Sequence, residues 1–312
     1  MASIGALQRH SWRRVAHSLR MSPSSSSSSC GRGCQPSNWV NFTQPAWQSW
    51  AVVVNDYECN SGTAFCQGSC QCGNKDTGQN ECAAPDVDHT NAQVQKDVTA
   101  WLQWLQSNLT FTGYRFDMCV GYSGQYTGQY IRATKPTFAV GEYWDDNVNN
   151  VVNWIKATGS ASSAFDFPLR DTLKGCVDSN NYSGMMSGIN PPGVIGVMPA
   201  NSVTFTDDHD TARNDRFGST DQIIQGYAYL FTHPGTPMIF WDDWNTSQIQ
   251  SALQRLMQIR NQMNLTPTMS LYIDKHQSGL YAAYTGTYLA LPRHATPRLA
   301  PPDTSATSLL AL

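Results

Sequence analysis

Carboxylate residues lie at or near the C-terminal ends of a series of short apolar segments in this sequence. The segments are FTGYRFDM (111–118), TFAVGEYW (137–144), SAFDF (163–167), SVTFTDD (202–208) and TPMIFWDD (236–243). Their carboxylates are Asp117, Glu142, Asp166, Asp208 with nearby Asp210, and Asp242 with Asp243. A single Asp at such a position can serve simply as the cap of the next helix. Several in succession, each after an apolar strand, indicate an active site at the carboxyl edge of a parallel sheet.

Two of these carboxylates stand in surroundings that suit nucleophilic and acid–base chemistry. Arg115 and Asp117 are two residues apart, so they share one face of a strand. The guanidinium charge is expected to keep Asp117 ionised and to lower its pKa, as a nucleophilic carboxylate requires. Glu142 precedes the aromatic residues Tyr143 and Trp144, which are expected to raise its pKa toward that of a general acid. Two carboxyl groups held in different environments suit glycoside hydrolysis.

The segments that carry these residues alternate with stretches of helical periodicity. One helical face, ending near Asn108, consists of Val94, Val98, Trp101, Leu102 and Leu105. Further helices are expected over residues 147–157 and 221–232, and a last one presents Ile249, Leu253, Leu256 and Met257. This alternation predicts an α/β fold with a parallel sheet and helices outside it, as a barrel or a doubly wound sheet.

The composition narrows the classes of function. With 312 residues, of which 40% are hydrophobic, the chain can bury a sizeable core. A formal net charge of -3 gives no electrostatic basis for binding nucleic acid, and no apolar run approaches the ~20 residues that span a membrane. No G-x-G-x-x-G motif follows a predicted strand, which excludes a dinucleotide-binding enzyme. The ten Trp and 13 Tyr could stack on sugar rings, although composition alone favours core packing.

Three motifs carry a family resemblance. GYRFDMCVGY, FAVGEYW and VTFTDDHDT resemble, in this order, the motifs of strands four, five and seven in the α-amylase family, glycoside hydrolase family 13. AAPDVDHTN, GVMPANSVTF and IIQGYAYLFTHPGTPMIF are similar to stretches of plant and algal α-amylases. The resemblance extends from about Trp39 to about Tyr284. It departs from the family at Val120, where strand four usually carries Lys, and at Asp208, where Asn is usual.

The resemblance implies roles for six residues. Asp117 would be the nucleophile, Glu142 the acid/base and Asp210 the carboxylate that stabilises the transition state. The side chains that contact substrate would be Arg115, His209 and Trp144. The implied reaction is retaining endo-hydrolysis of α-1,4-glucosidic bonds in starch, glycogen-like α-glucans or maltooligosaccharides, by a protein expected to be a monomer. A catalytically inactive amylase-like protein that binds glucan, or another family 13 activity, stays open as an alternative.

The resemblance also implies calcium. Asp86 and the carbonyl group of Gly121 match one calcium site of the plant-type enzymes, and Asp56, Asp76 and Asn80 match another. Oxygen-rich loops suit Ca²⁺, which takes ~6–8 oxygen ligands, although each Asp could equally be an ordinary turn residue. The same region holds five cysteines, Cys59, Cys66, Cys70, Cys72 and Cys82. Their spacing fits a tetrahedral zinc site poorly, and disulfide pairing is the favoured interpretation.

Four regions are expected along the chain. Residues 1–37 are rich in Arg and Ser and lack acidic residues, typical of a transit-like or disordered leader, so the compartment could be the chloroplast or extracellular. Residues 38–90 would be the irregular calcium-binding domain B, and 91–265 the barrel portion with strands four to eight. Residues 266–312 would hold a vestigial C-terminal β segment and a disordered tail. The fold that the resemblance implies is a TIM-type (β/α)8 barrel that lacks strands one to three, and these 312 residues alone are expected to show no measurable amylase activity.

Overall fold

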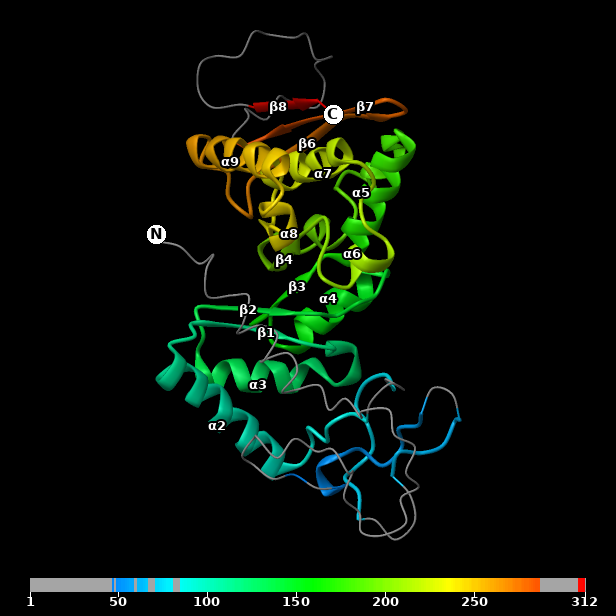
Figure 1. Cartoon of the computed structure of the whole chain (residues 1–312), viewed down its shortest axis with the longest axis vertical. Helices are drawn as coiled ribbons and strands as arrows, with labels where there is room; N and C mark the ends of the chain where they lie inside the picture. Colours follow the sequence, from blue (N-terminus) through cyan, green and yellow to red (C-terminus); the bar gives the residue numbers. More distant parts are fainter. Residues whose placement is uncertain are drawn as a thin grey trace. The chain divides into compact units, whose positions relative to one another are not determined.

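The computed structural model describes residues 47, 49–58, 61–66, 71–80, 85–286 and 308–311. The chain divides into two compact units, Met1–Tyr143 with Lys156–Ser162, and Trp144–Ile155 with Ser163–Leu312. Figure 1 shows the elements in sequence colours. Among the described residues, no helix is both long and apolar enough to cross a membrane. The predicted leader, residues 1–37, lies outside the described part of the chain.

The first unit contains two parallel strands and the helices before and between them. Its elements are η1 (Ser49–Ala51), α2 (Ala92–Leu109), β1 (Gly113–Phe116), η2 (Cys119–Gly121), α3 (Gly124–Thr134) and β2 (Phe138–Gly141). β1 and β2 pair in parallel, from Gly113 opposite Phe138 to Phe116 opposite Gly141. The helix α3 connects the two strands, because parallel neighbours need a crossover connection.

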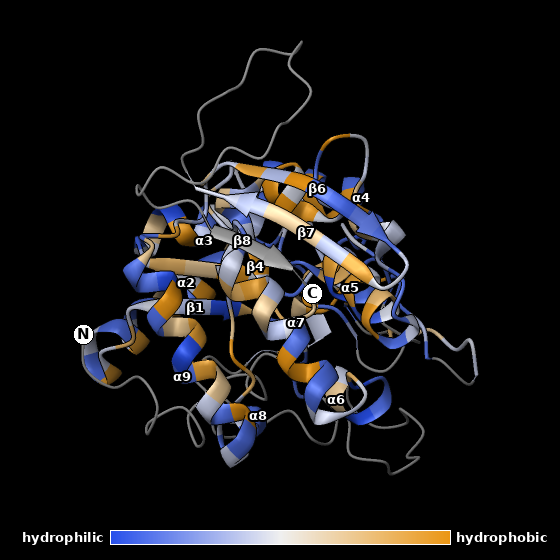
Figure 2. Cartoon of the chain, turned by 90° about the horizontal axis from the view of Figure 1, so that it is seen from above, coloured by the Kyte–Doolittle hydropathy of each residue, from blue (hydrophilic) through white to orange (hydrophobic). Residues whose placement is uncertain are grey.

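The helix α2 forms where the apolar periodicity predicts it. Its buried residues are Val94, Val98, Leu102 and Leu105, and the Asn91 side chain accepts hydrogen bonds from the backbone amides of Gln93 and Val94. Figure 2 shows hydrophobic and hydrophilic residues alternating along this helix. Its amphipathic face, rather than intrinsic propensity, therefore supplies most of the stability of α2.

The second unit continues the alternation of parallel strands and helices. It contains the strands β3 (Ser163–Phe165), β4 (Ser202–Thr204) and β5 (Thr236–Pro237), with β3 paired to β4 and β4 to β5 in parallel. Its helices are α5 (Phe167–Ser179), α6 (Thr211–Asn214), α7 (Thr220–Thr232), α8 (Trp241–Trp244) and α9 (Ser247–Gln262). Three short turns lie between β3 and β4: η3 (Tyr182–Met185), η4 (Val194–Gly196) and η5 (Pro199–Asn201). The helix α4 (Val148–Ala157) spans the boundary between the units.

The core of the second unit lies among α5, α7 and α9. Its buried side chains include Leu173 from α5, Tyr229, Leu230 and Phe231 from α7, and Leu253 from α9. Ser219 and Gln222 form a capping box that fixes the start of α7. The predicted α/β fold with five parallel strands in residues 111–243 is confirmed.

Two predictions need correction. The segment 236–243 was expected to be one buried strand, but β5 has two residues and Trp241–Trp244 form the helix α8. Asp243 is held by Arg216 and Tyr227, and these tertiary bonds favour the helical turn over a longer strand. In the predicted disordered tail, Ser308–Ala311 form the strand β8, while residues 287–307 lie outside the description. β8 pairs with β7 (Leu280–Thr285), which also pairs with β6 (Leu271–Gln277), both antiparallel, because a free edge of β7 offers unpaired backbone groups.

Candidate active site

In the first unit, one guanidinium group joins the two carboxylates that follow β1 and β2. Tyr114 and Phe116 are buried on one face of β1, so the pleat turns Arg115 to the other face. There Arg115 pairs through Nη1 with Asp117 Oδ1 and through Nη2 with Glu142 Oε1, at 2.8 Å for the second contact. The structure therefore brings together Asp117, Glu142 and Arg115.

The chain between Asp117 and η2 fixes the position of Glu142. The backbone amide of Glu142 donates to the carbonyl of Phe116 at 2.8 Å, and the amide of Cys119 donates to the Glu142 carbonyl at 2.9 Å. The amide of Met118 donates to Glu142 Oε2 at 3.1 Å. Met118 reaches this geometry with φ 46°, a left-handed backbone conformation that residues other than Gly rarely adopt. Unusual backbone of this kind is concentrated at functional sites.

The environment of Glu142 favours its protonated form. The side chain is 2% exposed, and burial raises its pKa to about 8, opposed by the Arg115 charge and reinforced by the charge of Asp117 and a hydrogen bond with it. At neutral pH the carboxyl group can therefore donate a proton. The sequence predicted this direction, and the causes are burial and the neighbouring Asp117. Trp144 belongs to the second unit, where it is 46% exposed and stacks on Phe167 with ring centroids 4.7 Å apart.

In the second unit, His209 and Asp210 lie together in the loop that follows β4. Nε2 of His209 is 3.1 Å from Oδ2 of Asp210, and both side chains are partly exposed. Asp208 shapes this turn because its Oδ1 accepts the backbone amides of Asp210 at 2.9 Å and Thr211 at 2.7 Å. An Asn side chain could accept the same two bonds, so the departure from the family at Asp208 preserves the turn.

Other carboxylates at the strand ends have structural partners. Asp166 is fully buried and caps α5, and it accepts bonds from the amides of Leu169, Val194 and Ile195 and from the Ser202 hydroxyl. Burial raises the pKa of Asp166, and these bonds oppose the shift. Asp243 pairs with Arg216 and accepts the Tyr227 hydroxyl. Asp242 lies in the first turn of α8. These residues position the loops.

Three further carboxylates gather in the irregular region of the first unit. One carboxylate oxygen from each of Asp56, Asp76 and Asp86 lies within 4.8 Å of the others. Oδ1 of Asp56 is fully buried and has no hydrogen-bond partner among the described residues, while its Oδ2 accepts the amide of Asp86 at 2.8 Å. Burial raises the pKa of Asp56, the Asp86 amide opposes this, and the Asp76 charge adds to it. The cluster therefore has the donor set and the unsatisfied oxygen of a cation site.

The remaining predicted ligands lie differently. Gly121 is so close to Asp86 that a Cβ atom there would lie 2.7 Å from Asp86 Oδ1. Asn80 uses its side-chain oxygen to accept the amide of Tyr57 at 2.9 Å. Asp56 and Asp76, predicted with Asn80, thus form one cluster with Asp86. Among the five cysteines of this region, Cys66 and Cys72 form a disulfide, and Cys59, Cys70 and Cys82 lie outside the described residues.

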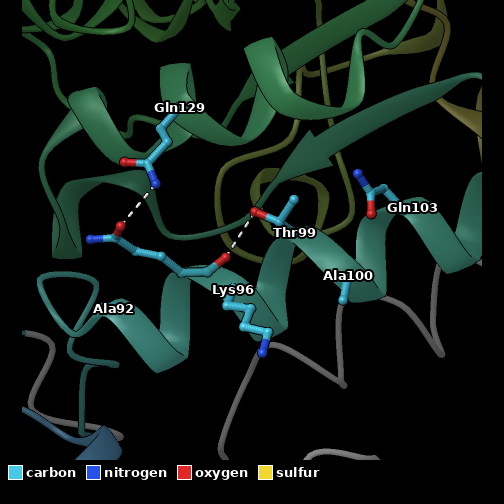
Figure 3. A pocket seen from close by; sticks show the side chains of 7 residues that line it. Ala92, Lys96, Thr99, Ala100, Gln103 and Gln129 are labelled. Carbon is cyan, nitrogen blue, oxygen red and sulfur yellow. Dashed lines mark hydrogen bonds between the residues drawn. The ribbon is translucent and has the colours of Figure 1, made fainter.

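A shallow pocket of about 400 Å³ lies over α2 and includes none of the predicted site residues. Figure 3 shows its polar lining from Lys96, Thr99, Gln103 of α2 and Gln129 of α3. Gln129 donates to Gln95 at 2.8 Å, so the amide groups of this pocket are in part already paired. The carboxylates of β1 and β2 remain the better candidate site.

No family model matches the chain. A probable α-amylase 2 of Arabidopsis thaliana is 37% identical over 238 residues, which cover 70% of this chain and 57% of the relative. The chloroplastic α-amylase 3 of the same plant is 35% identical over 272 residues, which cover 80% of this chain and 29% of the relative. The chain is a homologue of these plant α-amylases. It thus spans little more than half of the first of these α-amylases and under a third of the second.

Solved structures support the α-amylase fold. An Anoxybacillus α-amylase superposes with a TM-score of 0.54 at 17% identity, over 67% of this chain and 52% of that one. A cyclic α-maltosyl-(1→6)-maltose hydrolase from Arthrobacter globiformis gives 0.54 at 13% identity, over 80% and 60%. These likenesses confirm the predicted part of a TIM-type barrel.

Two features of this α-amylase homologue escaped sequence reasoning. The amide of Met118 carries no signal, because any residue except Pro has the same N–H and the left-handed φ is visible only in the fold. Arg170 is different: it lies on the otherwise apolar face of α5 with Leu169 and Leu173, and a charge among buried positions could have marked it as paired.

Proposed function

We propose that the protein carrying these residues hydrolyses α-1,4-glucosidic bonds in starch and related α-glucans with retention of configuration. The observation that supports this most is the Arg115 bridge between Asp117 and the buried, protonated Glu142. Arg115 cannot lose its proton, and its positive charge lies against Asp117, the proposed nucleophile. Retaining glycosidases require such a pair, with one carboxylate and one carboxylic acid close together.

In the proposed reaction, Glu142 protonates the glycosidic oxygen while a carboxylate oxygen of Asp117 attacks the anomeric carbon. The bond to the leaving sugar breaks, and a glycosyl ester forms on Asp117. Glu142, now ionised and held by Arg115 and the Met118 amide, removes a proton from water, which attacks the same carbon and releases Asp117. The family motif assigns Asp210, paired with His209, the stabilisation of positive charge in the oxocarbenium-like transition state.

The test uses three substitutions with a matched control. Asp117→Asn should abolish turnover, a loss of at least ~10³-fold, and leave glucan binding within about twofold. Glu142→Gln should lose starch hydrolysis but retain cleavage of a maltosyl fluoride, because fluoride leaves without a proton. Asp210→Asn should reduce the rate by ~10²–10³-fold. Asp221→Asn removes an exposed carboxylate in the first turn of α7, and it should change neither the rate of turnover nor glucan binding.

Proton NMR of the first product decides the stereochemistry. The α-anomer is expected first, and initial release of the β-anomer would refute the retaining mechanism. Glucan binding with no turnover of starch or fluoride would instead favour the alternative function, an inactive glucan-binding protein. Sedimentation of the protein at micromolar concentration tests the further proposal that it is a monomer.

We further propose that the cluster of Asp56, Asp76 and Asp86 holds Ca²⁺, with the carbonyl of Gly121 as a neighbouring ligand. The fit rests on the unsatisfied buried oxygen of Asp56 and on three carboxylates whose repulsion a divalent cation would offset. Bound calcium would stabilise this region and take no part in bond cleavage. Only three side chains supply charge, so weak affinity is expected.

Calcium titration with thermal unfolding tests this assignment. At 100 times its Kd, calcium should stabilise the native state by about 2.7 kcal/mol. The increase in Tm should disappear in Asp56→Asn and in Asp86→Ala, and persist in the control Glu58→Gln, an exposed carboxylate of the same region. An undiminished calcium effect in Asp86→Ala would show that calcium binds elsewhere.

A further inference from the structure

The loop that carries His209 and Asp210 is held at its start by a buried arginine of α5. Nε of Arg170 donates to the carbonyl of Thr206 at 3.0 Å, and Nη2 donates to Asp207 Oδ1 at 3.1 Å. Thr206 and Asp207 lie one residue beyond the end of β4 and precede the His209–Asp210 pair. One guanidinium therefore fixes both a backbone carbonyl and a side chain at the beginning of the loop.

The same guanidinium also holds the end of the loop. Its Nη1 contacts Asp215 Oδ2 at 2.5 Å, and its Nη2 donates to the carbonyl of Asp215, the C-cap residue of α6. The Arg170 guanidinium carbon lies 5.8 Å from the ring centroid of Phe217. Asp207 extends the clamp, because its Oδ2 accepts the Phe217 amide at 3.4 Å. The Arg170 guanidinium thus connects the two ends of the loop formed by residues 206–217.

Burial makes this clamp stiff. The Arg170 side chain is 2% exposed and that of Asp207 is fully buried, so neither partner can exchange the other for water. Arginine suits the position because its planar fork can donate in several directions at once, whereas lysine offers a compact charge that meets fewer acceptors. Removing the guanidinium would leave Asp207 as an uncompensated buried charge and would remove the Arg170 bonds at both ends of the loop.

We infer that Arg170 is a positioning residue, which holds the His209–Asp210 pair in place by clamping both ends of their loop. Asp208 sets the turn locally, through its bonds to the amides of Asp210 and Thr211. Arg170 places that turn relative to β4 and α5. This inference rests on the role of Asp210 in the proposed function, but the placement of the loop can be measured without any activity.

A purely structural role for Arg170 is the competing explanation, and Arg260 provides the matched control. Arg260 is also a largely buried arginine of the second unit, and it donates to the carbonyls of Phe231, His233 and Gly235 at the end of α7. Among the described residues, Arg260 makes no hydrogen bond to the 206–217 loop. Arg170→Met and Arg260→Met should therefore both destabilise the protein, and only the first should loosen the loop.

Hydrogen exchange of individual amides decides between the two explanations. In Arg170→Met, the amides of Asp210 and Thr211 should exchange about tenfold faster or more, relative to the amides of α9 in the same protein. Arg170→Lys should give an intermediate increase, and Arg260→Met none at the loop. In a protein that turns over maltosyl fluoride, Arg170→Met should also lower kcat by ~10–100-fold, with KM within about twofold.

Equal acceleration at the loop and at α9 in Arg170→Met, or unchanged exchange at Asp210 and Thr211, would overturn the inference. Faster loop exchange with unchanged kcat in an active protein would overturn it as well. A wild-type protein without turnover would refute the proposed hydrolase, and the exchange measurements would still decide whether Arg170 clamps the loop.

Discussion

The protonated state of Glu142 leads to a prediction about stability that needs no substrate. Glu142→Gln replaces the buried carboxyl group by a neutral amide of nearly the same shape. In the wild type, burial raises the pKa of Glu142 from 4.5 to about 8. The native state therefore holds a proton on this group over a range of pH in which the unfolded chain has released it.

The sign and size follow from proton linkage. Because the native state binds more protons, the wild type loses stability as pH rises from 4.5 toward 8, by at most about 1.4 kcal/mol per pH unit. The loss amounts to about 3 kcal/mol by pH 7 and at most about 5 kcal/mol above pH 8. The amide of the variant does not titrate, so this dependence should vanish. The changed contact with Arg115 adds an offset that is independent of pH in this range.

The assay is urea unfolding of both proteins at several pH values between 4.5 and 9. The variant's free energy of unfolding, minus that of the wild type, should increase with pH and level off above pH 8. The exposed carboxylate Glu58, changed to Gln, controls for the loss of one acidic group. A difference that stays flat or falls with pH would show that Glu142 is ionised in the folded protein, and would remove the basis for its role as general acid.

Three further results are expected. Met118→Val should disfavour the left-handed backbone and withdraw the amide from Glu142. A carbon-13 NMR titration should then show the pKa of the Glu142 carboxyl raised by roughly one unit. Met118→Gly should keep the amide hydrogen bond and leave this pKa unchanged. Asp166→Ala should cost about 3–5 kcal/mol in urea unfolding, because it leaves buried amides without acceptors; a loss below ~1 kcal/mol would contradict the capping role. Gly128→Ala should lower the free energy of unfolding by about 1–3 kcal/mol, despite alanine's higher helix propensity, because the methyl group would overlap the Thr158 carbonyl. A raised Tm in calorimetry would contradict this prediction.

The predicted elements agree with the structure where local patterning decides them. The apolar face of α2 and the strands β1 and β2 lie within the predicted segments, because a hydrophobic pattern that repeats every few residues predicts which of their side chains are buried. The prediction was wrong at residues 236–243, where Asp243 is bound by residues 16 and 27 positions away. Periodicity says nothing about such contacts.

In the candidate site, too, short-range spacing predicts some contacts, and others depend on the tertiary fold. Spacing of two along a strand was sufficient to predict that Arg115 accompanies Asp117. It could not show that Arg115 also pairs with Glu142, because that contact depends on the parallel register of Arg115 opposite Val140. The grouping of Asp56, Asp76 and Asp86 likewise depends on the path of irregular loops over 30 residues.

The sequence by itself determined the alternation of strands and helices, the family, and the residue types available for catalysis, since these depend on side-chain chemistry and short-range order. Only the tertiary structure decided which carboxylates face each other and which are bound as structural caps. It also decided that Glu142 is buried with a raised pKa, that Met118 directs its amide toward it, and that Arg170 clamps the loop of Asp210. These properties arise from burial and from contacts between distant residues, which fix the protonation and the placement of groups whose identity the sequence had already supplied.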